Sequence, residues 1–418
     1  MILNLPYGEA RLALDLRGLR IQQLHPCAPR APADLGALIS QALENPLSGP
    51  PLTELCKAHH RVTIVVPDGT RKAELSRVLP AILELIFQTN QKAEVSILIA
   101  CGTHAPPIDS ELGALLGELP HGVAVMSHNA RDSSSLVEVG HLAHMPVRIN
   151  RLAVEAEVLI TVGAIKHHYF AGFGGGPKMI FPGVAGYEEI QANHALVLEK
   201  TGQSWNRNPQ CEPGRLEGNP VAQQIMEAAD MRPPDLALCL VAGAEGRIAW
   251  AGAGAWRDAY MAATEVARRW YETSGTAHRL MVVTGGGAPY DSTLIQAHKA
   301  LDAGARFLED GGEMLFIASM ERGAGSDEMR PFLEDPTPDA ILGSLGRKWI
   351  QYGHTTLRIV EKTSRFRIHL HSRLDPDLAL RLGFHPVDDP AAIVEAWREN
   401  LPGQTVGVMT GAAVFPRQ

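Results

Sequence analysis

One short segment of the chain carries several residue types that can do chemistry. Between residues 166 and 194 it contains two histidines, His168 and His194, a lysine, Lys178, and a run of three glycines. A histidine can bind a metal or move a proton near neutral pH, and a lysine can form a covalent bond to a carbonyl carbon. Consecutive glycines let the backbone approach a ligand closely, and their N–H groups can surround a phosphate. The segment therefore predicts a cofactor that bears a phosphate, a metal or a covalent link to the protein.

The glycine run consists of Gly174, Gly175 and Gly176, and it fits neither of the two common nucleotide motifs. The motif G-x-x-x-x-G-K-[ST] fails because Met179 stands where a serine or threonine is required. The motif G-x-G-x-x-G fails because the run lacks a strand and a helix directly on either side and a later acidic partner. A tight turn that needs three glycines is the plain alternative to a ligand cradle.

Two further loops place polar residues directly behind predicted strands. Short apolar runs rich in β-branched residues predict buried strands at residues 62–66, 95–101 and 157–162. Asp68 and Arg71 follow the first of these strands, His104 follows the second, and the glycine segment follows the third. Open α/β sheets bind their ligands beyond the carboxyl ends of the strands. We therefore expect the three loops to lie together along one sheet edge.

Some of these residues have a plainer interpretation when each is taken alone. His194 shares a predicted helix face with Ile190, which is typical of a half-buried histidine whose ring nitrogens are hydrogen-bonded. Gln296 and Lys299 stand three residues apart on one face of a later predicted helix, and that face could simply be solvated. They follow a second glycine run after another predicted strand, so a cleft between domains would give them a ligand to bind.

Strands and helices alternate along most of the 418 residues, which predicts an α/β protein with mostly parallel sheets. A chain of this length is expected to form more than one domain. We predict a cofactor-binding α/β domain at residues 1–273 and a second α/β domain at 274–418, whose tail can pack back on the first. The active site is expected in the cleft between them. An apolar run predicts a strand at 357–360, and Pro80 is expected to kink or restart a helix at 72–87.

Composition excludes several classes of protein. The net charge is −8 and no basic stripe occurs, which argues against a nucleic-acid partner. The five cysteines form no C-x-x-C pair, so a zinc ribbon and a disulfide framework are not expected, and H-E-x-x-H is absent. No apolar stretch reaches the length of a membrane span, and the first residues do not form a signal peptide. The composition predicts a cytoplasmic protein without a membrane partner.

Taken together, these residues resemble the nickel-dependent lactate racemase family. The matching blocks occur in the family's order, with its internal spacing, at residues 68–71, 102–104, 168–194 and 296–299. The segment at 214–221 resembles family members outside the lactate enzymes proper. The resemblance covers most of the chain and weakens after about residue 330.

The resemblance implies a specific cofactor. The family uses a nickel pincer nucleotide, a pyridinium mononucleotide whose thioamide and thiocarboxylate arms bind the metal. By position, Lys178 would form the covalent thioamide link, and His194 would be the protein ligand to nickel. Further contacts to the mononucleotide would come from Asp68, Gly174, Gly175 and Gly176. The enzymes that make the cofactor are the expected protein partners.

The resemblance also implies a reaction, the inversion of C2 of a 2-hydroxy acid through a 2-keto acid. His104 and His168 would stand on opposite sides of C2 and exchange the hydroxyl proton, while hydride moves to the cofactor ring and returns. Arg71 would bind the substrate carboxylate, and Gln296 and Lys299 would hold it from the second domain. Domain closure would exclude water from the hydride-transfer step.

Some positions depart from the lactate enzymes. Ile295 stands where an aromatic residue is expected, and Lys166 and His167 add polar groups beside His168. These departures favour a 2-hydroxy acid that is larger or more polar than lactate. Lys166 or His167 would then bind a distal carboxylate or hydroxyl of the substrate. The alternative is that the two side chains are simply solvated in the loop. Two other functions stay open. A nucleotide-dependent dehydrogenase on the same fold would consume free NAD, and a non-catalytic binder of the nickel nucleotide would not require both His104 and His168.

Overall fold

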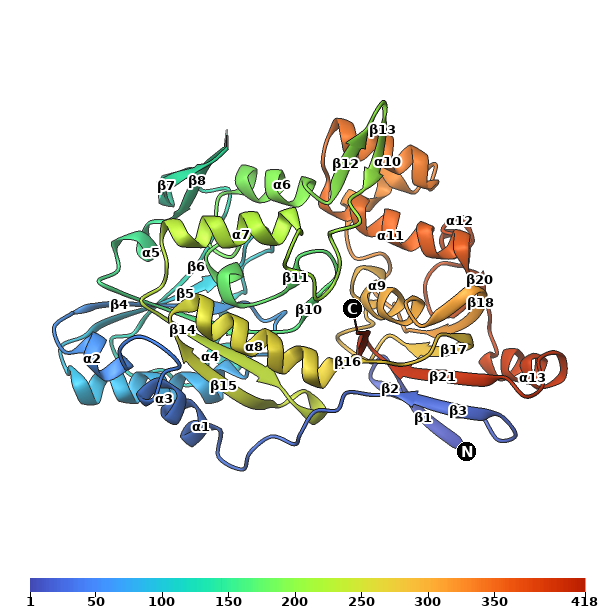
Figure 1. Ribbon diagram of the computed structural model, residues 1–418, viewed down its shortest axis with the longest axis horizontal. Coiled ribbons are helices and arrows are strands. Elements are labelled where there is room, and N and C mark those ends of the chain that lie inside the picture. The colour runs from blue at the N-terminus through green and yellow to red at the C-terminus, as the bar shows by residue number, and fades with distance from the viewer. Residues whose placement is uncertain (144, 418) are drawn as a thin grey trace. The chain divides into compact units, whose positions relative to one another are not determined.

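The computed structural model describes residues 1–143 and 145–417. The chain divides into two compact units, which are discontinuous in sequence (Figure 1). Unit 1 comprises Met1–Pro26, Leu198–Arg207 and Tyr271–Gln418, and unit 2 comprises Cys27–Val197 and Asn208–Trp270. The predicted division at residue 273 assigned the N-terminal residues and the segment at 198–207 to the first domain, whereas both group with the C-terminal part of the chain.

Unit 2 is built on a six-stranded sheet in the order β15-β14-β9-β4-β5-β6. These strands are β4 (Arg61–Pro67), β5 (Glu94–Ala100), β6 (Ala124–Ser127), β9 (Val158–Ala164), β14 (Leu236–Ala242) and β15 (Ile248–Gly254). Neighbouring strands run parallel except β14 and β15, which are antiparallel. The chain proceeds from β4 through β5 to β6 and then crosses to β9 on the other side of β4. The topological switch point therefore lies between β4 and β9, where such sheets bind ligands.

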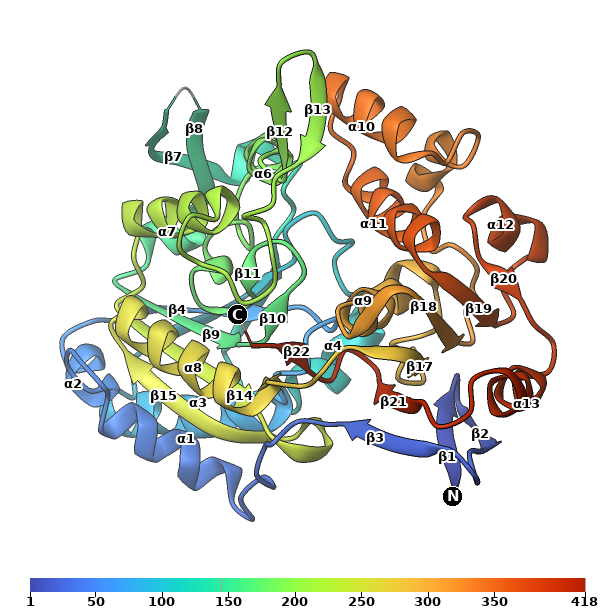
Figure 2. The ribbon, with the colours of Figure 1, turned by 45° about the vertical axis from the view of Figure 1, so that its right-hand side comes forward.

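Two layers of helix cover this sheet (Figures 1 and 2). The buried side chains of α1 (Leu35–Glu44) and α3 (Leu75–Thr89) share one core with alternate residues of β4, β5, β9 and β14. On the opposite face lie α7 (Pro220–Met231) and α8 (Trp256–Tyr271). The strands are thus buried on both faces, which explains their nearly continuous apolar sequences. α3 is one helix that contains Pro80, so the predicted restart there is wrong.

Shorter elements complete unit 2. They are α2 (Leu52–Cys56), α4 (Asp109–Leu116), η1 (Ser133–Ser135), the hairpin of β7 (Leu136–Leu142) and β8 (Met145–Asn150), α5 (Arg151–Glu155), the hairpin of β10 (His167–His168) and β11 (Gly172–Phe173), η2 (Gly176–Met179), α6 (Tyr187–Ala195) and η3 (Ala244–Gly246). The 3-10 helix η2 packs near β9, β4, β14 and α7. The glycine segment is therefore placed against the middle of the sheet.

Unit 1 has its own six-stranded sheet, in the order β20-β19-β18-β17-β21-β3, with all neighbours parallel. The strands are β3 (Arg20–Leu24), β17 (His278–Thr284), β18 (Leu308–Ile317), β19 (Arg367–His371), β20 (His385–Pro386) and β21 (Thr405–Thr410). Because β3 pairs with β21, the N-terminal residues complete a sheet made by the end of the chain. Both sheets confirm the predicted α/β class with mostly parallel strands.

The remaining elements of unit 1 are three strand pairs and several helices. The pairs are β1 (Ile2–Tyr7) with β2 (Ala10–Asp15), β12 (Leu198–Thr201) with β13 (Ser204–Arg207), and β16 (Glu272–Thr273) with β22 (Phe415–Pro416). The helices are α9 (Leu294–Ala305), η4 (Asp327–Phe332), α10 (Pro338–Arg347), α11 (Gln351–Arg365), α12 (Pro376–Arg381) and α13 (Pro390–Asn400). None of the helices among the described residues is long and apolar enough to cross a membrane.

The strand predicted at residues 357–360 is wrong, because these residues lie inside α11. The run contains Leu357, Ile359 and Val360, and a short apolar run of this kind does not distinguish a strand from a buried helix. All residues from 353 to 360 are buried in α11, including the charged Arg358. Over its full length, Gln351–Arg365, α11 also contains polar and partly exposed residues, so its amphipathic pattern appears only in a window longer than these four residues.

Candidate active site

Several candidate site residues lie in the loops that follow three neighbouring strands of unit 2. β9, β4 and β5 lie side by side and run parallel, so their carboxyl ends meet at one edge of the sheet. Asp68 and Arg71 follow β4, His104 follows β5, and Lys166 and His168 follow β9. The structure therefore brings together the three loops that the sequence predicted to meet.

The buried Asp68 and the half-buried His104 form a dyad across two of these loops. Oδ2 of Asp68 lies 2.6 Å from Nδ1 of His104, and Oδ1 accepts hydrogen bonds from the backbone N–H and the hydroxyl of Thr70. Burial by itself would raise the pKa of Asp68, but the contacts with His104 and Thr70 and the charge of Arg71 lower it. An ionised Asp68 keeps the ring proton of His104 on Nδ1, so Nε2 presents a lone pair.

His168 is held differently from His104. It lies in the small hairpin β10–β11, where it pairs with Gly172, and its ring stacks against Tyr169 at 5.0 Å between centroids. The backbone N–H of Ala171 donates to Nδ1 of His168 at 3.2 Å. This contact favours the neutral tautomer whose proton is on Nε2. The two histidines are thus set in opposite tautomers.

Close packing requires glycine at two positions of the run. Gly175 and Gly176 have φ of +70° and +53°, which side chains rarely adopt. A Cβ on Gly176 would lie 2.2 Å from the ring of Tyr260 in α8, and one on Gly175 would lie 2.6 Å from the carbonyl oxygen of Ala164. The N–H of Gly174 donates to the carbonyl oxygen of Lys166 at 2.8 Å. These contacts hold η2 and its lysine against the sheet.

Lys178 is the lysine that η2 presents, and its surroundings disfavour the charged form. Burial, and then the positive charge of Arg71, lower the pKa of Lys178 to about 7. Its Nζ lies 5.8 Å from the ring centroid of Phe170. A substantial fraction of its amine is therefore unprotonated at neutral pH, which is the form that acts as a nucleophile.

His194, in the last turn of α6, is 6% exposed. Neither of its ring nitrogens has a hydrogen-bond partner among the residues that the structure describes. Burial, followed by the charges of Lys178 and His104, lowers the pKa of His194 to about 3, so its ring is neutral. The structure thus differs from the plain expectation of a hydrogen-bonded histidine. A buried neutral imidazole with unused nitrogens is suited to binding a metal.

Sequence reasoning missed Phe170, although its ring lies close to both His168 and His194. Its centroid is 4.6 Å from that of His168 and 5.2 Å from that of His194. The carbonyl oxygen of Phe170 accepts a hydrogen bond from the side chain of Asn219, which is fully buried. An aromatic residue inside a glycine-rich polar segment was the sign that could have identified it.

The approach to the site is positively charged. Burial, and then the positive charges of Arg71 and Lys72, lower the pKa of Lys166 to about 8, although its side chain still reaches solvent. His167 is buried and packs on the ring of Phe173 at 4.7 Å. Of the two additional polar residues, Lys166 is therefore the one that can meet a ligand.

The two predicted residues of the other unit lie together on α9. Nζ of Lys299 donates to Oε1 of Gln296 at 2.7 Å, and both side chains are half-buried rather than fully solvated. The side chain of Thr293 caps the start of the helix by accepting from the N–H of Gln296. The pair offers an ammonium and an amide that can bind a carboxylate.

The described residues contain no group of three or more histidine, cysteine, aspartate or glutamate side chains that could hold a metal ion. A protein site of the usual zinc type is therefore not formed by this part of the chain. A metal at His194 would therefore not find a set of three such side chains among the described residues.

Comparison with known proteins identifies the family. A model of the lactate racemase N-terminal domain matches residues 7–206. A lactate racemase from Thermoanaerobacterium thermosaccharolyticum is 31% identical over 349 residues, which cover 82% of this chain and 80% of that protein. The chain belongs to the lactate racemase family. Membership in this family makes it an enzyme of the isomerase class.

Other lactate racemase relatives agree in sequence and fold. The lactate racemase from Lactiplantibacillus plantarum is 27% identical over 357 residues, covering 81% of this chain and 80% of that protein. The structure of the lactate racemase apoprotein from T. thermosaccharolyticum superposes with a TM-score of 0.88 over 100% of both chains, at 27% identity. A protein from Thermotoga maritima, at 17% identity and a TM-score of 0.65, shares the fold.

Proposed function

We propose that this enzyme inverts C2 of a 2-hydroxy acid by reversible hydride transfer to a covalently held nickel pincer nucleotide. The observation that carries the proposal is His194, a buried and neutral histidine whose two ring nitrogens have no hydrogen-bond partner among the described residues. It lies close to Lys178, whose amine has a pKa of about 7. A single metal ligand beside a nucleophilic lysine suits a cofactor that brings most of its metal ligands with it.

The residues of unit 2 fit this cofactor. Lys178 would carry the thioamide link, and His194 would bind nickel through a ring nitrogen. We propose that Gly174, Gly175 and Gly176 bring the backbone close to the mononucleotide. Asp68 is proposed to contribute chiefly by fixing His104, because both of its carboxylate oxygens already accept hydrogen bonds. When bound, the cofactor supplies the carbon that accepts hydride from C2 and returns it.

The two histidines would move the hydroxyl proton. Nε2 of His104 is ready to accept it, because Asp68 keeps the other ring proton on Nδ1 and stabilises the imidazolium that forms. Nε2 of His168 presents a proton in the arrangement described, so it would first act as a hydrogen-bond donor to the substrate oxygen. For His168 to serve as the base in the reverse direction, its proton must move to Nδ1 and the contact with Ala171 must open.

The substrate carboxylate would be bound by Arg71, with Gln296 and Lys299 as further ligands. We propose that the substrate is larger or more polar than lactate. Lys166, beside Arg71 and Lys72, would bind its distal carboxylate or hydroxyl, and Ile295 leaves α9 without the aromatic side chain expected in lactate enzymes. The enzyme is proposed to act in the cytoplasm, where the cofactor-making enzymes would load it.

The decisive experiment is co-expression with enzymes that make the cofactor, followed by intact-mass and nickel analysis. We expect a covalent adduct and about one nickel per chain, both lost in Lys178→Ala and kept in the surface control Lys92→Ala. Inversion of C2 is then compared for L-lactate, L-malate and D-gluconate without added NAD, as racemisation of the first two acids and epimerisation of the third. Active protein that carries no adduct, or activity that requires free NAD, would contradict the proposed function. A wide preference for lactate would overturn only the proposed substrate class.

A further inference from the structure

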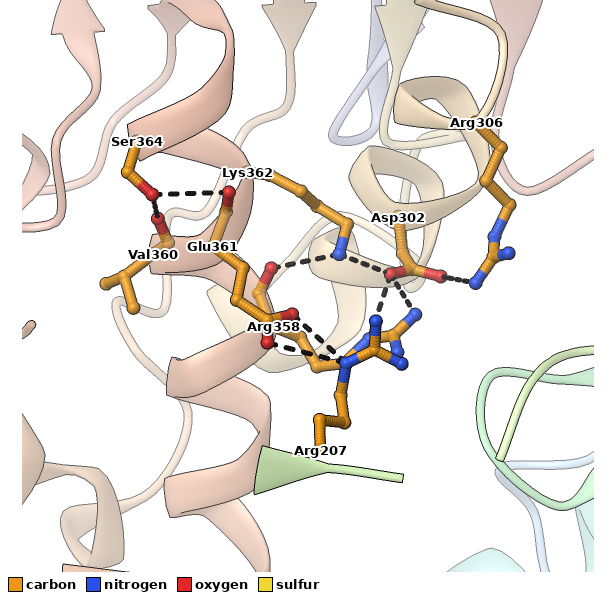
Figure 3. Close-up of polar contacts among 8 residues, drawn as sticks. All are labelled: Arg207, Asp302, Arg306, Arg358, Val360, Glu361, Lys362 and Ser364. Carbon is orange, nitrogen blue, oxygen red and sulfur yellow. Dashed lines mark hydrogen bonds and ion pairs between the residues drawn. The ribbon is translucent and has the colours of Figure 1, made fainter. Parts of the chain in front are cut away.

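Unit 1 contains a buried ion cluster centred on Asp302 that the proposed chemistry does not use (Figure 3). Asp302 lies in α9, and its Oδ1 accepts from Nε of Arg358 at 3.0 Å and from Nη2 of the same residue at 2.5 Å. Nζ of Lys362 lies 2.6 Å from this oxygen, and Nη2 of Arg306 lies 3.3 Å from Oδ2. One carboxylate therefore holds three cations, two of which come from α11.

The cluster is removed from water to an unusual degree for charged groups. Asp302 is 1% exposed and Arg358 is 2% exposed. Burial would raise the pKa of Asp302, but the charges of Arg358, Lys362 and Arg306 lower it well below its ordinary range. Burial lowers the pKa of Lys362 to about 8 even though Asp302 opposes the shift. A buried cation is unfavourable without an anionic partner. The cations of α11 therefore fix the position of Asp302, and with it that of α9.

Asp302 belongs to the same helix as the proposed carboxylate ligands. It follows Lys299 by three residues, and Gln296 precedes Lys299 by three more. At a rise of about 1.5 Å per residue, the clamp at Asp302 lies about 9 Å along the helix axis from Gln296. A tilt or slide of α9 at Asp302 would therefore displace the ammonium of Lys299 and the amide of Gln296 together.

α11 is itself held from a second direction. Nε of Arg207, in β13, donates to Oε2 of Glu361, in α11, at 3.2 Å (Figure 3). The helix that carries Arg358 and Lys362 is thereby attached to the β12–β13 hairpin as well as to α9. α11 can thus act as a fixed support for α9.

We propose that Asp302 is a positioning residue for substrate binding. Through Arg358 and Lys362 it fixes α9 so that Lys299 and Gln296 meet the substrate carboxylate without rearrangement. This inference rests on the proposed function, because it takes the carboxylate to be the ligand of these two residues. A neutral residue at 302 removes the buried carboxylate that Arg358 and Lys362 contact, so α9 shifts and the carboxylate contacts weaken.

The test is steady-state kinetics of the cofactor-loaded enzyme on whichever of L-lactate, L-malate and D-gluconate the wild type racemises best. We expect Asp302→Asn to raise KM about 10-fold and to change kcat by less than about 3-fold, as for lost ground-state binding. Lys299→Ala should raise KM by a comparable factor. The double variant should raise KM by clearly less than the product of the two single effects, because Asp302 acts partly through Lys299 and only its effect on Gln296 remains.

Asp310→Asn is the matched control, since Asp310 pairs with Arg365 of the same helix α11 at an exposed site. It should leave KM unchanged. If Asp302→Asn does not fold, Lys362→Met removes one cation and should raise KM in the same non-additive way. An unchanged KM in Asp302→Asn would overturn the inference but not the proposed function. The same holds if the KM increases of the two single variants multiply in the double variant. A wild-type holoenzyme that racemises none of the three acids would overturn the proposed function and the inference with it.

Discussion

At the scale of single residues, the site shows how surroundings give the same side chain different properties. His104 donates to a buried carboxylate, His168 accepts from a backbone N–H, and His194 has no hydrogen-bond partner among the described residues. In the proposed function these histidines would act as a base, a hydrogen-bond donor and a metal ligand, respectively. Lys178 is likewise distinguished from a surface lysine by its burial beside Arg71.

The depressed pKa of Lys178 predicts a pH-dependent reactivity. Below about pH 7 its amine is protonated and unreactive, and above that value the neutral amine accumulates. In apoprotein treated briefly with acetic anhydride, we expect the acetylation of Lys178 to rise with a midpoint near pH 7, measured by peptide mass spectrometry. The urea-unfolded chain is the control, in which the midpoint should move to about 10. A midpoint near 10 in the folded apoprotein would show that the amine is not desolvated.

At the scale of elements, the residue that caps the start of α7 also holds the loop that carries Phe170. Oδ1 of Asn219 accepts from the N–H groups of Val221 and Ala222 and so caps the helix, while Nδ2 donates to the carbonyl oxygens of Phe170 and Arg215. Pro220 at the first helical position is suited to its fixed φ. One side chain therefore begins a helix and holds the loop that carries Phe170.

We expect Asn219→Ala to lower the free energy of unfolding by about 2–4 kcal/mol. The loss of a cap costs about 1 kcal/mol, and buried carbonyl groups left without a donor cost about 1–3 kcal/mol more. Urea titration followed by circular dichroism measures the change. Asp389→Ala is the control, because Asp389 caps α13 at the surface and should cost only about 1 kcal/mol. Equal losses in the two variants would contradict a structural link from Asn219 to the site loop.

At the scale of the whole molecule, each unit gathers segments that are distant in sequence. The N-terminal strand β3 completes the sheet of unit 1, and Leu14 and Leu16 share its core with Val394 and Trp397. Contacts of such long range explain why a division at residue 273 differs from the two units of the structure, since pairing with a distant strand is not written in the local sequence.

This arrangement predicts that N-terminal core residues matter to unit 1. Leu16 is 0% exposed, so Leu16→Ala should lower the free energy of unfolding by about 2–5 kcal/mol through the lost burial and the cavity that remains. Ile2→Ala is the control, because Ile2 is 56% exposed, and it should change stability by less than about 0.5 kcal/mol. Guanidinium titration compares them. A tolerated Leu16→Ala would mean that the first residues are not part of the core.

The sequence by itself determined the α/β class and the polar loops behind the strands, to which we assign the proposed chemistry. Alternating apolar runs specify strands and helices locally, and parallel strands leave their following loops at one sheet edge. The same local reading failed at residues 357–360, where a buried helix has the composition of a strand. The periodicity of apolar residues is a property of a short stretch of sequence. It carries no information on which distant segments pack against that stretch.

Only the tertiary structure decided how those residues are tuned. Asp68 meets His104 across 36 positions of sequence, and Arg358 meets Asp302 across 56. The low pKa values of Lys178 and His194 arise from burial and from neighbouring cations, which depend on the packing of η2 and α6 in unit 2. Solvation and charge at a site are set by everything that surrounds it in space. The residue types were therefore readable in the chain, whereas their protonation, pairing and support came from the fold.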